Sequence, residues 1–321
     1  MVGGIVSLLH NIKKRAGGLM ELKSTMSDSF LELFYKEIEC GISETYSKLN
    51  LHILKIENNQ FCYPELIRHL QNHFISFALS RKEKQEFLKD ERYGEMFAAA
   101  ASKFRDYNVN EGEAGELLLF CFLEAHLKAP KILTKLEIKL SSNDYAKGSD
   151  GIHLLKVAEK EYQLVFGESK LDQKLTTSIT NAFKSIHEFI SRDRNSISDE
   201  IGLLNSQLCK EVFDEDSYQF VKSIVMPKAN VDNPIVKNNA FAIFAGFEVA
   251  PTIDEKKMTN SDFLKEIKTK IKKEVEAKMS HIKSKIEEYD LHGYTFYVYT
   301  FPFMKLDETR KNIIKKLIRA E

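Results

Sequence analysis

The segment KGSDGIHLLKVAEKEYQLVFGESK, residues 147–170, decides the fold of this chain. It contains two apolar-rich stretches, 152–157 and 162–170, with residues 158–161 between them. This pattern and this loop length predict a β-hairpin. Charged residues gather at the open end of the hairpin, so one segment predicts both the fold and the chemistry.

Three side chains at the open end support a functional hypothesis. Asp150 lies in a Gly-Ser-Asp-Gly turn before the first strand, and Glu168 and Lys170 end the second strand. Because side chains alternate along a strand, Glu168 and Lys170 project from the same face. Neighbouring strands lie ~4.8 Å apart, so Asp150 and Glu168 can share one divalent cation. We therefore expect two carboxylates and an ammonium group in one pocket.

Such a pocket suits phosphodiester hydrolysis. Mg²⁺ prefers oxygen ligands, and Mn²⁺ accepts the same donors. The charge of the ion would lower the pKa of a bound water and stabilise the negative charge of the transition state. Lys170 would orient or deprotonate the attacking water, or hold the scissile phosphate. The sequence leaves these roles of Lys170 open.

A third carboxylate is expected from the preceding helix. Glu116 would complete the metal shell, and Glu113, about one turn away, is the alternative. The pattern E-x-K also occurs at five other places, but only Glu168 and Lys170 have the strand–turn–strand context. His153 is predicted to point away from Asp150 as a structural histidine, and Ser169 is interpreted as a packing residue.

Hydrophobic periodicity assigns the remaining elements. It predicts helices over 28–48, 64–80, 95–107, 112–128, 177–190 and 262–289, with a terminal helix that begins at Asp307. It predicts further strands over 51–61, 134–142, 241–249 and 294–301. We therefore expect an α/β protein with a mainly helical N-terminal region, 1–108, as the candidate partner-binding part. Residues 109–321 would form the catalytic core with basic C-terminal helices.

Composition excludes several protein classes. The 321 residues carry 47 Lys and Arg against 47 Asp and Glu, and 43% of them are hydrophobic, as in an average globular protein. The four cysteines form no C-x-x-C pair, which favours reduced thiols and a cytoplasmic location. No run approaches the ~18 apolar residues of a membrane span. The basic cluster near the N-terminus follows the short apolar run, so a secretory signal is not predicted, and Met20 or Met26 is an alternative start.

The neutral total charge hides a basic C-terminal part. Residues 255–319 carry a net charge of +6, whereas residues 1–254 carry −5. Lysine-rich helix faces are usually solvated, but they are also where a phosphate backbone binds. Near the hairpin, Lys147, Lys174 and Lys184 are candidate DNA contacts. Neither G-x-x-x-x-G-K-[ST] nor G-x-G-x-x-G is present, so nucleotide hydrolysis would have to come from a partner.

These residues carry a resemblance to a known family. A helix glutamate, a turn aspartate and E-x-K on the next strand follow the order of the PD-(D/E)xK nuclease superfamily. The motifs GEAGELLL at 112–119, KGSDGIH at 147–153 and FGESK at 166–170 resemble those of the HamA family, the nuclease subunit of Hachiman anti-phage defence. The resemblance covers 110–190 well and the remainder loosely. The proline of the superfamily name is replaced by Ser149, at a position that varies widely.

The resemblance implies a restriction-endonuclease-like core, a mixed sheet flanked by helices. It also implies a Mg²⁺-dependent DNase that partners with a superfamily 2 helicase, HamB, and stays inactive until the helicase meets aberrant DNA. Carried over to this chain, Asp150 and Glu168 become metal ligands, Lys170 the catalytic lysine and Glu116 the helix carboxylate. Two other functions stay open: a non-catalytic DNA-binding or scaffold subunit, and an RNase, which shares the same chemistry.

Overall fold

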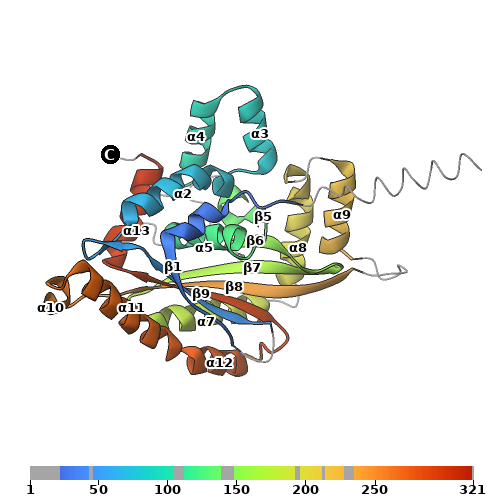
Figure 1. Ribbon diagram of the computed structural model, residues 1–321. Helices are drawn as coiled ribbons and strands as arrows, with labels where there is room; N and C mark the ends of the chain where they lie inside the picture. The colour runs from blue at the N-terminus through green and yellow to red at the C-terminus, as the bar shows by residue number, and fades with distance from the viewer. Residues whose placement is uncertain are drawn as a thin grey trace, which may run out of the picture.

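A seven-stranded mixed sheet forms the centre of the molecule (Figure 1). The structure is a computed structural model and describes residues 22–42, 46–104, 112–138, 148–191, 196–211, 214–227 and 235–319. From edge to edge the strands are β1 Phe34–Gly41, β2 Lys48–Leu54, β9 Thr295–Phe303, β8 Val236–Glu248, β7 Glu161–Leu171, β6 Gly151–Ala158 and β5 Lys131–Thr134. Strands β2, β9, β8 and β7 pair in parallel, and the outer strands at both edges pair antiparallel. An α/β architecture with a mixed sheet is therefore confirmed.

The predicted hairpin is confirmed as β6 and β7. Their register pairs Gly151 with Gly167 at one end and Ala158 with Glu161 at the other. β7 also pairs along its whole length with the buried strand β8, in parallel. The hairpin is therefore fixed on both sides of β7, and its open end cannot shift without breaking two strand pairings.

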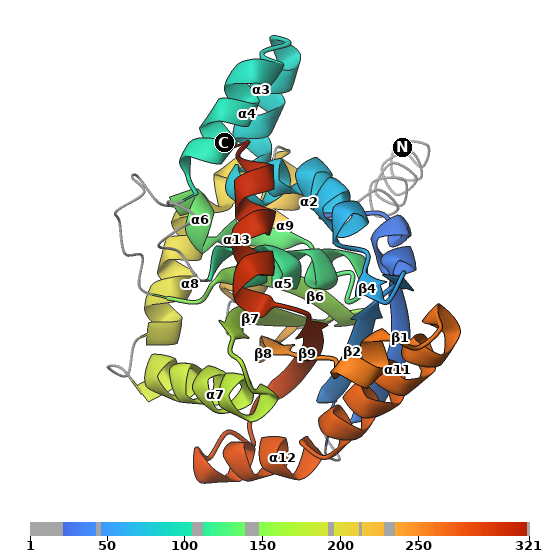
Figure 2. The same cartoon turned by 90° about the vertical axis from the view of Figure 1, so that its left-hand side faces the viewer.

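Helices cover both faces of the sheet (Figure 2). One face carries η1 Asp28–Leu33, α2 Tyr63–Ala78, α3 Arg81–Lys89, α4 Tyr93–Ser102, α5 Glu113–Ala125, α6 Lys135–Ile138 and α13 Leu306–Leu317. The other carries α7 Leu175–Ser191, α11 Asn260–Glu276 and α12 Met279–Glu288, with α10 Ile253–Lys256 leading into α11. Near the β5 edge lie α8 Ser196–Gln207, η2 Leu208–Lys210 and α9 Glu215–Val225. A separate small hairpin consists of β3 Ile56–Glu57 and β4 Gln60–Phe61.

Helix α5 is the central helix of its layer. It packs on β7 and β8 and is covered by α2 and α13, so nearly every residue from Glu113 to Ala125 is buried. A helix that is apolar on all sides belongs in such a position. Its aromatic residue Phe122 contacts the rings of Phe34, Phe244 and Tyr299 from three different strands. The core thereby fixes the helix that carries Glu116 against the hairpin.

Three sequence predictions need correction. The helix predicted over 28–48 is wrong, because among the described residues of this range 28–33 form a short 3-10 helix and 34–41 form β1. A β-bulge shifts the register of β1 against β2 between Lys36 and Ile38, so the apolar residues of this strand do not keep a period of two. Pairing of β1 with β2 then decides for the strand. A mainly helical N-terminal region is consequently not clearly seen, since its first long elements join the sheet.

The strand predicted over 134–142 is also wrong where the structure describes it. β5 ends at Thr134, and residues 135–138 form the short helix α6. The Thr134 hydroxyl accepts a hydrogen bond from the Glu137 amide at 3.2 Å, as an N-cap does, and so starts a helix at this point. Residues 139–142 and Lys147 lie outside the described residues, as do 1–21 with Met20.

The single helix predicted over 262–289 is two helices. α11 ends at Glu276 and α12 begins at Met279, with Ala277 as the C-cap of α11. In the described part of the chain, no helix combines the length and the apolar surface required to cross a bilayer.

Candidate active site

A cavity of about 430 Å³ opens at the ends of β6 and β7. Its charged lining consists of the carboxylates Glu116, Asp150, Glu168 and Glu188 and the lysines Lys135 and Lys170. The walls come from α5, α6, α7 and the hairpin, so elements far apart in the sequence meet here. The three residues that the sequence singled out therefore share one cavity.

Asp150 is positioned by the hairpin backbone. Its amide donates to the Gly167 carbonyl at 2.9 Å, which extends the β6–β7 ladder by one residue. Its Oδ2 accepts a hydrogen bond from the Ser169 amide at 2.8 Å. These two bonds fasten the aspartate of the turn to the strand that carries Glu168, and its side chain is buried.

Glu168 and Lys170 project from the same face of β7, as alternation predicts. Lys170 Nζ lies 2.7 Å from Glu168 Oε1, and the Ser185 hydroxyl of α7 donates a hydrogen bond to the same carboxylate. Burial, followed by the nearby charge of Asp150, raises the pKa of Glu168 to about 7, although Lys170 opposes this shift. Burial acts to lower the pKa of Lys170, but Glu168 outweighs burial and raises it. The two carboxylates thus crowd each other, and positive charge holds them together.

Lys135, at the start of α6, is a second lysine of this site that the sequence analysis did not identify. Its Nζ lies 3.6 Å from Asp150 Oδ1, the carboxylate oxygen that Ser169 does not contact. Burial acts to lower the pKa of Lys135, but Asp150, Glu116 and Glu168 together raise it. The sequence analysis assigned residue 135 to a strand. No local sequence pattern predicts α6, because this short helix depends on contacts made in the folded chain.

Glu200 of α8, next to the cavity, is a further residue that the sequence did not indicate. Its Oε1 accepts a hydrogen bond from the Ser149 amide at 2.8 Å, next to Asp150. Burial is the main cause of the raised pKa of this carboxyl group. A Cβ on Gly148, whose φ is +144°, would lie 2.0 Å from the same oxygen. Only glycine therefore permits both the backbone of this turn and the close approach of α8.

The remaining predicted residues are divided between the cavity and its surroundings. Glu116 lines the cavity, whereas Glu113 is buried outside its lining. Lys184 is exposed and lies 3.9 Å from Glu188, one of the lining residues. Lys174 is exposed at the start of α7. Both lysines stay predictions as DNA contacts, and Lys147 lies outside the described residues.

His153 and Ser169 have the structural surroundings that the alternation suggested. His153 is buried, and its Nδ1 lies 2.8 Å from the Ala129 carbonyl. The Ser169 side chain packs toward Gly115 of α5, while its amide holds Asp150. Ser169 thus contributes to the site through its backbone.

The donor chemistry of the cavity fits a hard divalent cation. Asp150, Glu168 and Glu116 supply carboxylate oxygens, which Mg²⁺ and Mn²⁺ prefer. Burial, followed by the charge of Asp150, raises the pKa of Glu168, and a nearby positive charge would oppose both effects. Among the described residues, however, no three His, Cys, Asp or Glu side chains are already arranged as a metal-binding group. The donors are present, and Asp150 and Glu168 each lie close to a lysine.

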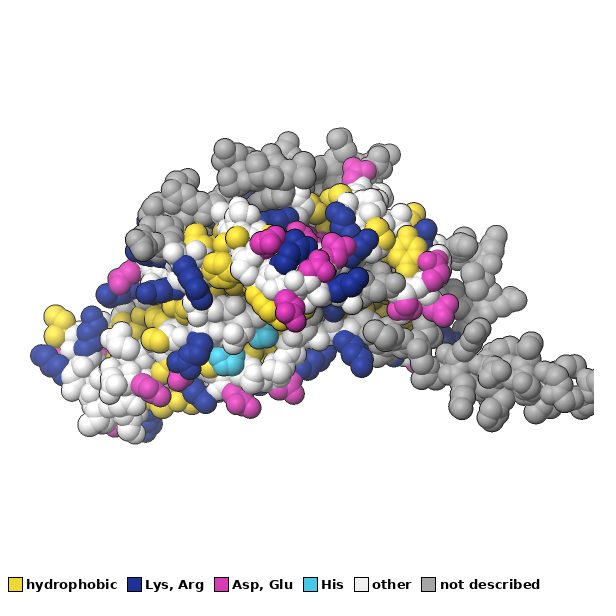
Figure 3. Space-filling view, turned by 90° about the horizontal axis from the view of Figure 1, so that it is seen from above, with side chains coloured by type: hydrophobic (Ala, Val, Ile, Leu, Met, Phe, Trp, Pro, Cys, Tyr) yellow, Lys and Arg dark blue, Asp and Glu magenta, His cyan; other side chains and the backbone are white. Residues whose placement is uncertain are grey.

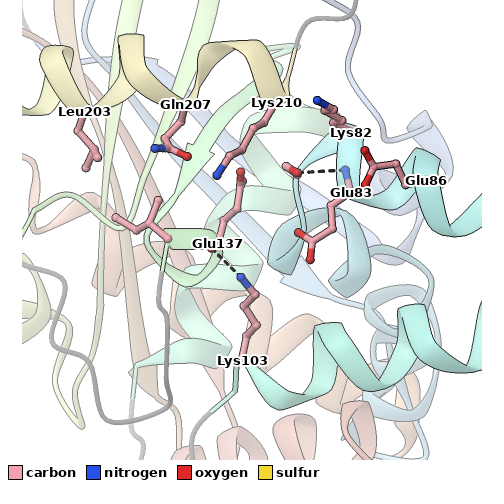
Figure 4. Close-up of a pocket in the computed structure, with 10 residues that line it drawn as sticks. Lys82, Glu83, Glu86, Lys103, Glu137, Leu203, Gln207 and Lys210 are labelled. Carbon is pink, nitrogen blue, oxygen red and sulfur yellow. Dashed lines mark hydrogen bonds between the residues drawn. The ribbon is translucent and has the colours of Figure 1, made fainter.

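A second cavity, of about 590 Å³, lies on the other side of α6 (Figure 4). There Lys103 donates to the Glu137 carbonyl at 2.7 Å, and Lys82 and Lys210 stand at the same cavity. The short helix α6 thus places Lys135 in one cavity and Glu137 in the other. The larger cavity contains none of the residues predicted for catalysis, so we place the candidate site in the smaller one.

The face of the molecule that α2, α3 and α4 form carries charges of both signs. Lysine and arginine side chains are interspersed with acidic ones across this face (Figure 3). A surface that follows a phosphate backbone is usually positive over a continuous area. This face therefore offers no argument for DNA binding, which agrees with a candidate site elsewhere.

Comparison with protein families identifies the family of this chain. A HamA family model matches residues 28–317, nearly the whole chain and all of the candidate site. A comparison with curated proteins finds no match. The family match spans β1 to α13, well beyond the hairpin motifs. The chain therefore belongs to the HamA family, a component of Hachiman anti-phage defence.

Proposed function

We propose that this protein is a metal-dependent DNase of the PD-(D/E)xK superfamily that acts as the effector of its defence complex. One observation carries the proposal: Asp150, Glu168 and Lys170 share a cavity in which Glu168 and Lys170 are paired at 2.7 Å. Two acids and an ammonium group at one cavity are the groups that metal-assisted phosphodiester hydrolysis requires. Perturbed pKa values at a cavity favour a functional site.

The order of the elements supports the superfamily assignment. Helix α5, which carries Glu116, is followed by the turn of Asp150, then by Glu168 and Lys170 on β7, and then by α7 against the sheet. A fold alone does not imply a function, so the argument rests on the site. The acidic residues of the site occupy the positions that the superfamily order implies, one on the helix, one in the turn and one on the strand, and this supports the proposal.

Each residue of the site has a task in the proposed reaction. Asp150, Glu168 and Glu116 would hold Mg²⁺ or Mn²⁺, which supplies the positive charge that acidifies the attacking water and stabilises the charge of the phosphate. Ser169 and Ser185 orient Asp150 and Glu168 through hydrogen bonds. Lys170, held beside Glu168, would position the attacking water or the scissile phosphate. The walls from α5 and α7 would keep these groups aligned while DNA binds.

Regulation by a helicase is part of the same proposal. The HamA resemblance implies a superfamily 2 helicase partner of the HamB kind, which restrains the nuclease until it meets aberrant DNA. The projecting pair α3 and α4, seen at the top of Figure 1, is a suitable place for such a contact, because no residue of α3 is buried. Charge-reversing substitutions on the exposed face of α3 would test this contact without disturbing the sheet.

A substrate and metal panel tests the proposed activity. Purified protein, alone and with its helicase partner, is incubated with plasmid, linear and single-stranded DNA and with RNA, in Mg²⁺ or in EDTA. We expect DNA degradation that requires the metal and is lost in Lys170→Met, while the exposed control Lys210→Met behaves as wild type. Binding of DNA without cleavage under every condition would indicate a scaffold subunit, and preferential loss of RNA would indicate an RNase.

A further inference from the structure

The candidate site already contains its own counter-ions. Asp150 Oδ2 receives the Ser169 amide, and Oδ1 faces Lys135 Nζ at 3.6 Å. Glu168 receives Lys170 at 2.7 Å and the Ser185 hydroxyl. Asp150 and Glu168, two of the three proposed ligands, therefore already contact protein groups.

Lys135 is the cation at the centre of this arrangement. Its ammonium group lies 3.6 Å from Asp150 Oδ1 and lines the same cavity as Glu116 and Glu168, the other carboxylates that would hold a divalent ion. Lys170, by contrast, stands beside Glu168 on the same strand and has Asp150 as a more distant neighbour. Of the two lysines that the described residues contribute to the cavity lining, Lys135 is the one from outside the hairpin.

The charges of the cavity make Lys135 and a metal ion competitors. The Ser169 amide already occupies Asp150 Oδ2, so a divalent ion bound to Asp150 would use Oδ1, the oxygen that Lys135 Nζ faces at 3.6 Å. Two cations beside one carboxylate oxygen repel each other strongly in a partly buried site. Replacing the ammonium group of Lys135 by the ion would remove this repulsion. The side chain can withdraw, because Lys135 is one-quarter exposed and extends from a helix of only four residues.

We infer that Lys135 is a built-in counter-ion that occupies the metal position and must leave it before the divalent ion binds. This inference rests on the proposed metal-dependent function and adds a control to it. Metal affinity is then set by competition with a tethered ammonium group. A DNA phosphate brings one further negative charge, which allows the displaced Lys135 to pair with it while the metal is retained. Metal and DNA would consequently bind with positive coupling.

Direct measurement of metal binding tests the inference without relying on activity. Mn²⁺ is titrated into the full chain without DNA, and binding is followed by calorimetry and by the electron paramagnetic resonance of free Mn²⁺. Lys135→Met removes the charge and keeps much of the side-chain volume, so we expect about tenfold tighter binding or more. Lys135→Arg, whose planar guanidinium pairs more firmly with a carboxylate, should bind Mn²⁺ no more tightly than wild type. Lys82→Met, an exposed lysine of the other cavity, is the matched control and should bind as wild type.

Thermal unfolding gives a second readout. Without its counter-ion, the carboxylate cluster repels itself, so Lys135→Met should melt below wild type in EDTA. Because a bound ion stabilises only the folded state, Mn²⁺ should raise the melting temperature of this variant more than that of wild type.

The outcomes separate this inference from the proposed function. Equal or weaker Mn²⁺ binding by Lys135→Met, with wild type still binding, overturns the counter-ion role and leaves the metal-dependent function in place. Absence of Mn²⁺ binding in every variant overturns both. If Lys135→Met does not fold, tighter binding by Lys135→Arg than by wild type overturns the inference on its own.

Discussion

At the scale of single residues, Asp150 is held by a different group on each carboxylate oxygen. The Ser169 amide contacts Oδ2 and Lys135 approaches Oδ1. The hydrogen bond from the Ser169 amide needs only an acceptor oxygen at position 150. The contact with Lys135 and any bound metal also need a negative charge there. Asparagine at this position would therefore separate the structural role from the electrostatic one.

Asp150→Asn should lower the rate of metal-dependent cleavage about 100-fold or more, while folding is maintained. The amide oxygen can still accept from Ser169, so we expect unchanged circular dichroism and a small change in the free energy of unfolding. The initial rate of plasmid degradation in Mg²⁺ measures the loss. Cleavage within a few fold of the wild-type rate would remove Asp150 from the site.

The pH dependence of stability at the residue scale is set in part by His52. This side chain is buried among the rings of Phe34, Phe122 and Tyr299, and burial, followed by the charge of His126, lowers its pKa to about 3. In the unfolded chain its pKa is ~6.5, so the unfolded state takes up a proton that the folded state refuses. Stability from this group is present above pH ~6.5 and is lost as the pH falls toward 3.

His52→Phe should weaken this acid sensitivity. Between pH 7.5 and 5.0, wild type should lose ~2 kcal/mol of unfolding free energy because of this histidine alone, and the variant should lose that much less. Urea unfolding of both proteins at the two pH values gives the difference. The comparison across pH cancels any change in packing, so an equal loss in both proteins would contradict the assignment.

At the scale of elements, α5 lies unusually close to β7 at Gly115. A Cβ there would lie 2.2 Å from Ser169 Oγ and 3.1 Å from Leu171 Cγ. Since the Ser169 amide holds Asp150, the spacing of helix and strand is coupled to the geometry of the site. Glycine is needed in this helix for packing, although it is a poor helix former.

Gly115→Ala should therefore destabilise the protein by ~1–3 kcal/mol and reduce cleavage, despite the better helix propensity of alanine. The double variant Gly115→Ala, Ser169→Ala removes the clashing hydroxyl and should recover most of both losses. Chemical unfolding and the cleavage rate are measured for the single and double variants. A stable and fully active Gly115→Ala would show that β7 moves freely against α5.

The elements also show which parts of the site could be predicted. Glu168 and Lys170 were accessible because strand alternation and a short loop are local properties of 147–170. Lys135 and Glu200 were not, because α6 depends on the Thr134 cap and α8 reaches Ser149 across 51 residues of chain. The helix predicted over 28–48 failed because a β-bulge in β1 interrupts the alternation that marks a strand, and only pairing with β2 shows that this segment is extended. Contacts made only on folding decided these cases.

At the scale of the whole molecule, the first third of the chain is part of the sheet. β2 pairs in parallel with β9, and its residues Leu49, Leu51 and Ile53 are fully buried. The β9 partners of Leu49 and Leu51, Val298 and Thr300, lie about 250 residues away in the sequence, which is why local periodicity did not place β1 and β2 in the sheet. Whether 108 and 109 separate two domains stays a prediction.

Deletion of residues 1–107 should therefore leave a fragment that does not fold stably. It would expose the edge of β9 and the apolar side chains that pack on β1 and β2. We expect loss of a cooperative melting transition and rapid proteolysis, compared with full-length protein. A fragment that melts cooperatively near the wild-type temperature would instead establish residues 109–321 as an independent domain.

The rate of plasmid cleavage by Glu168→Gln tests the central claim most directly. Glutamine matches glutamate in size and removes only the charge that pairs with Lys170 and would bind the metal. With the helicase partner, Mg²⁺ and aberrant DNA present, wild type and the exposed control Glu287→Gln should degrade the plasmid, and Glu168→Gln should fall to the level seen in EDTA. Cleavage by Glu168→Gln at the wild-type rate would contradict the account.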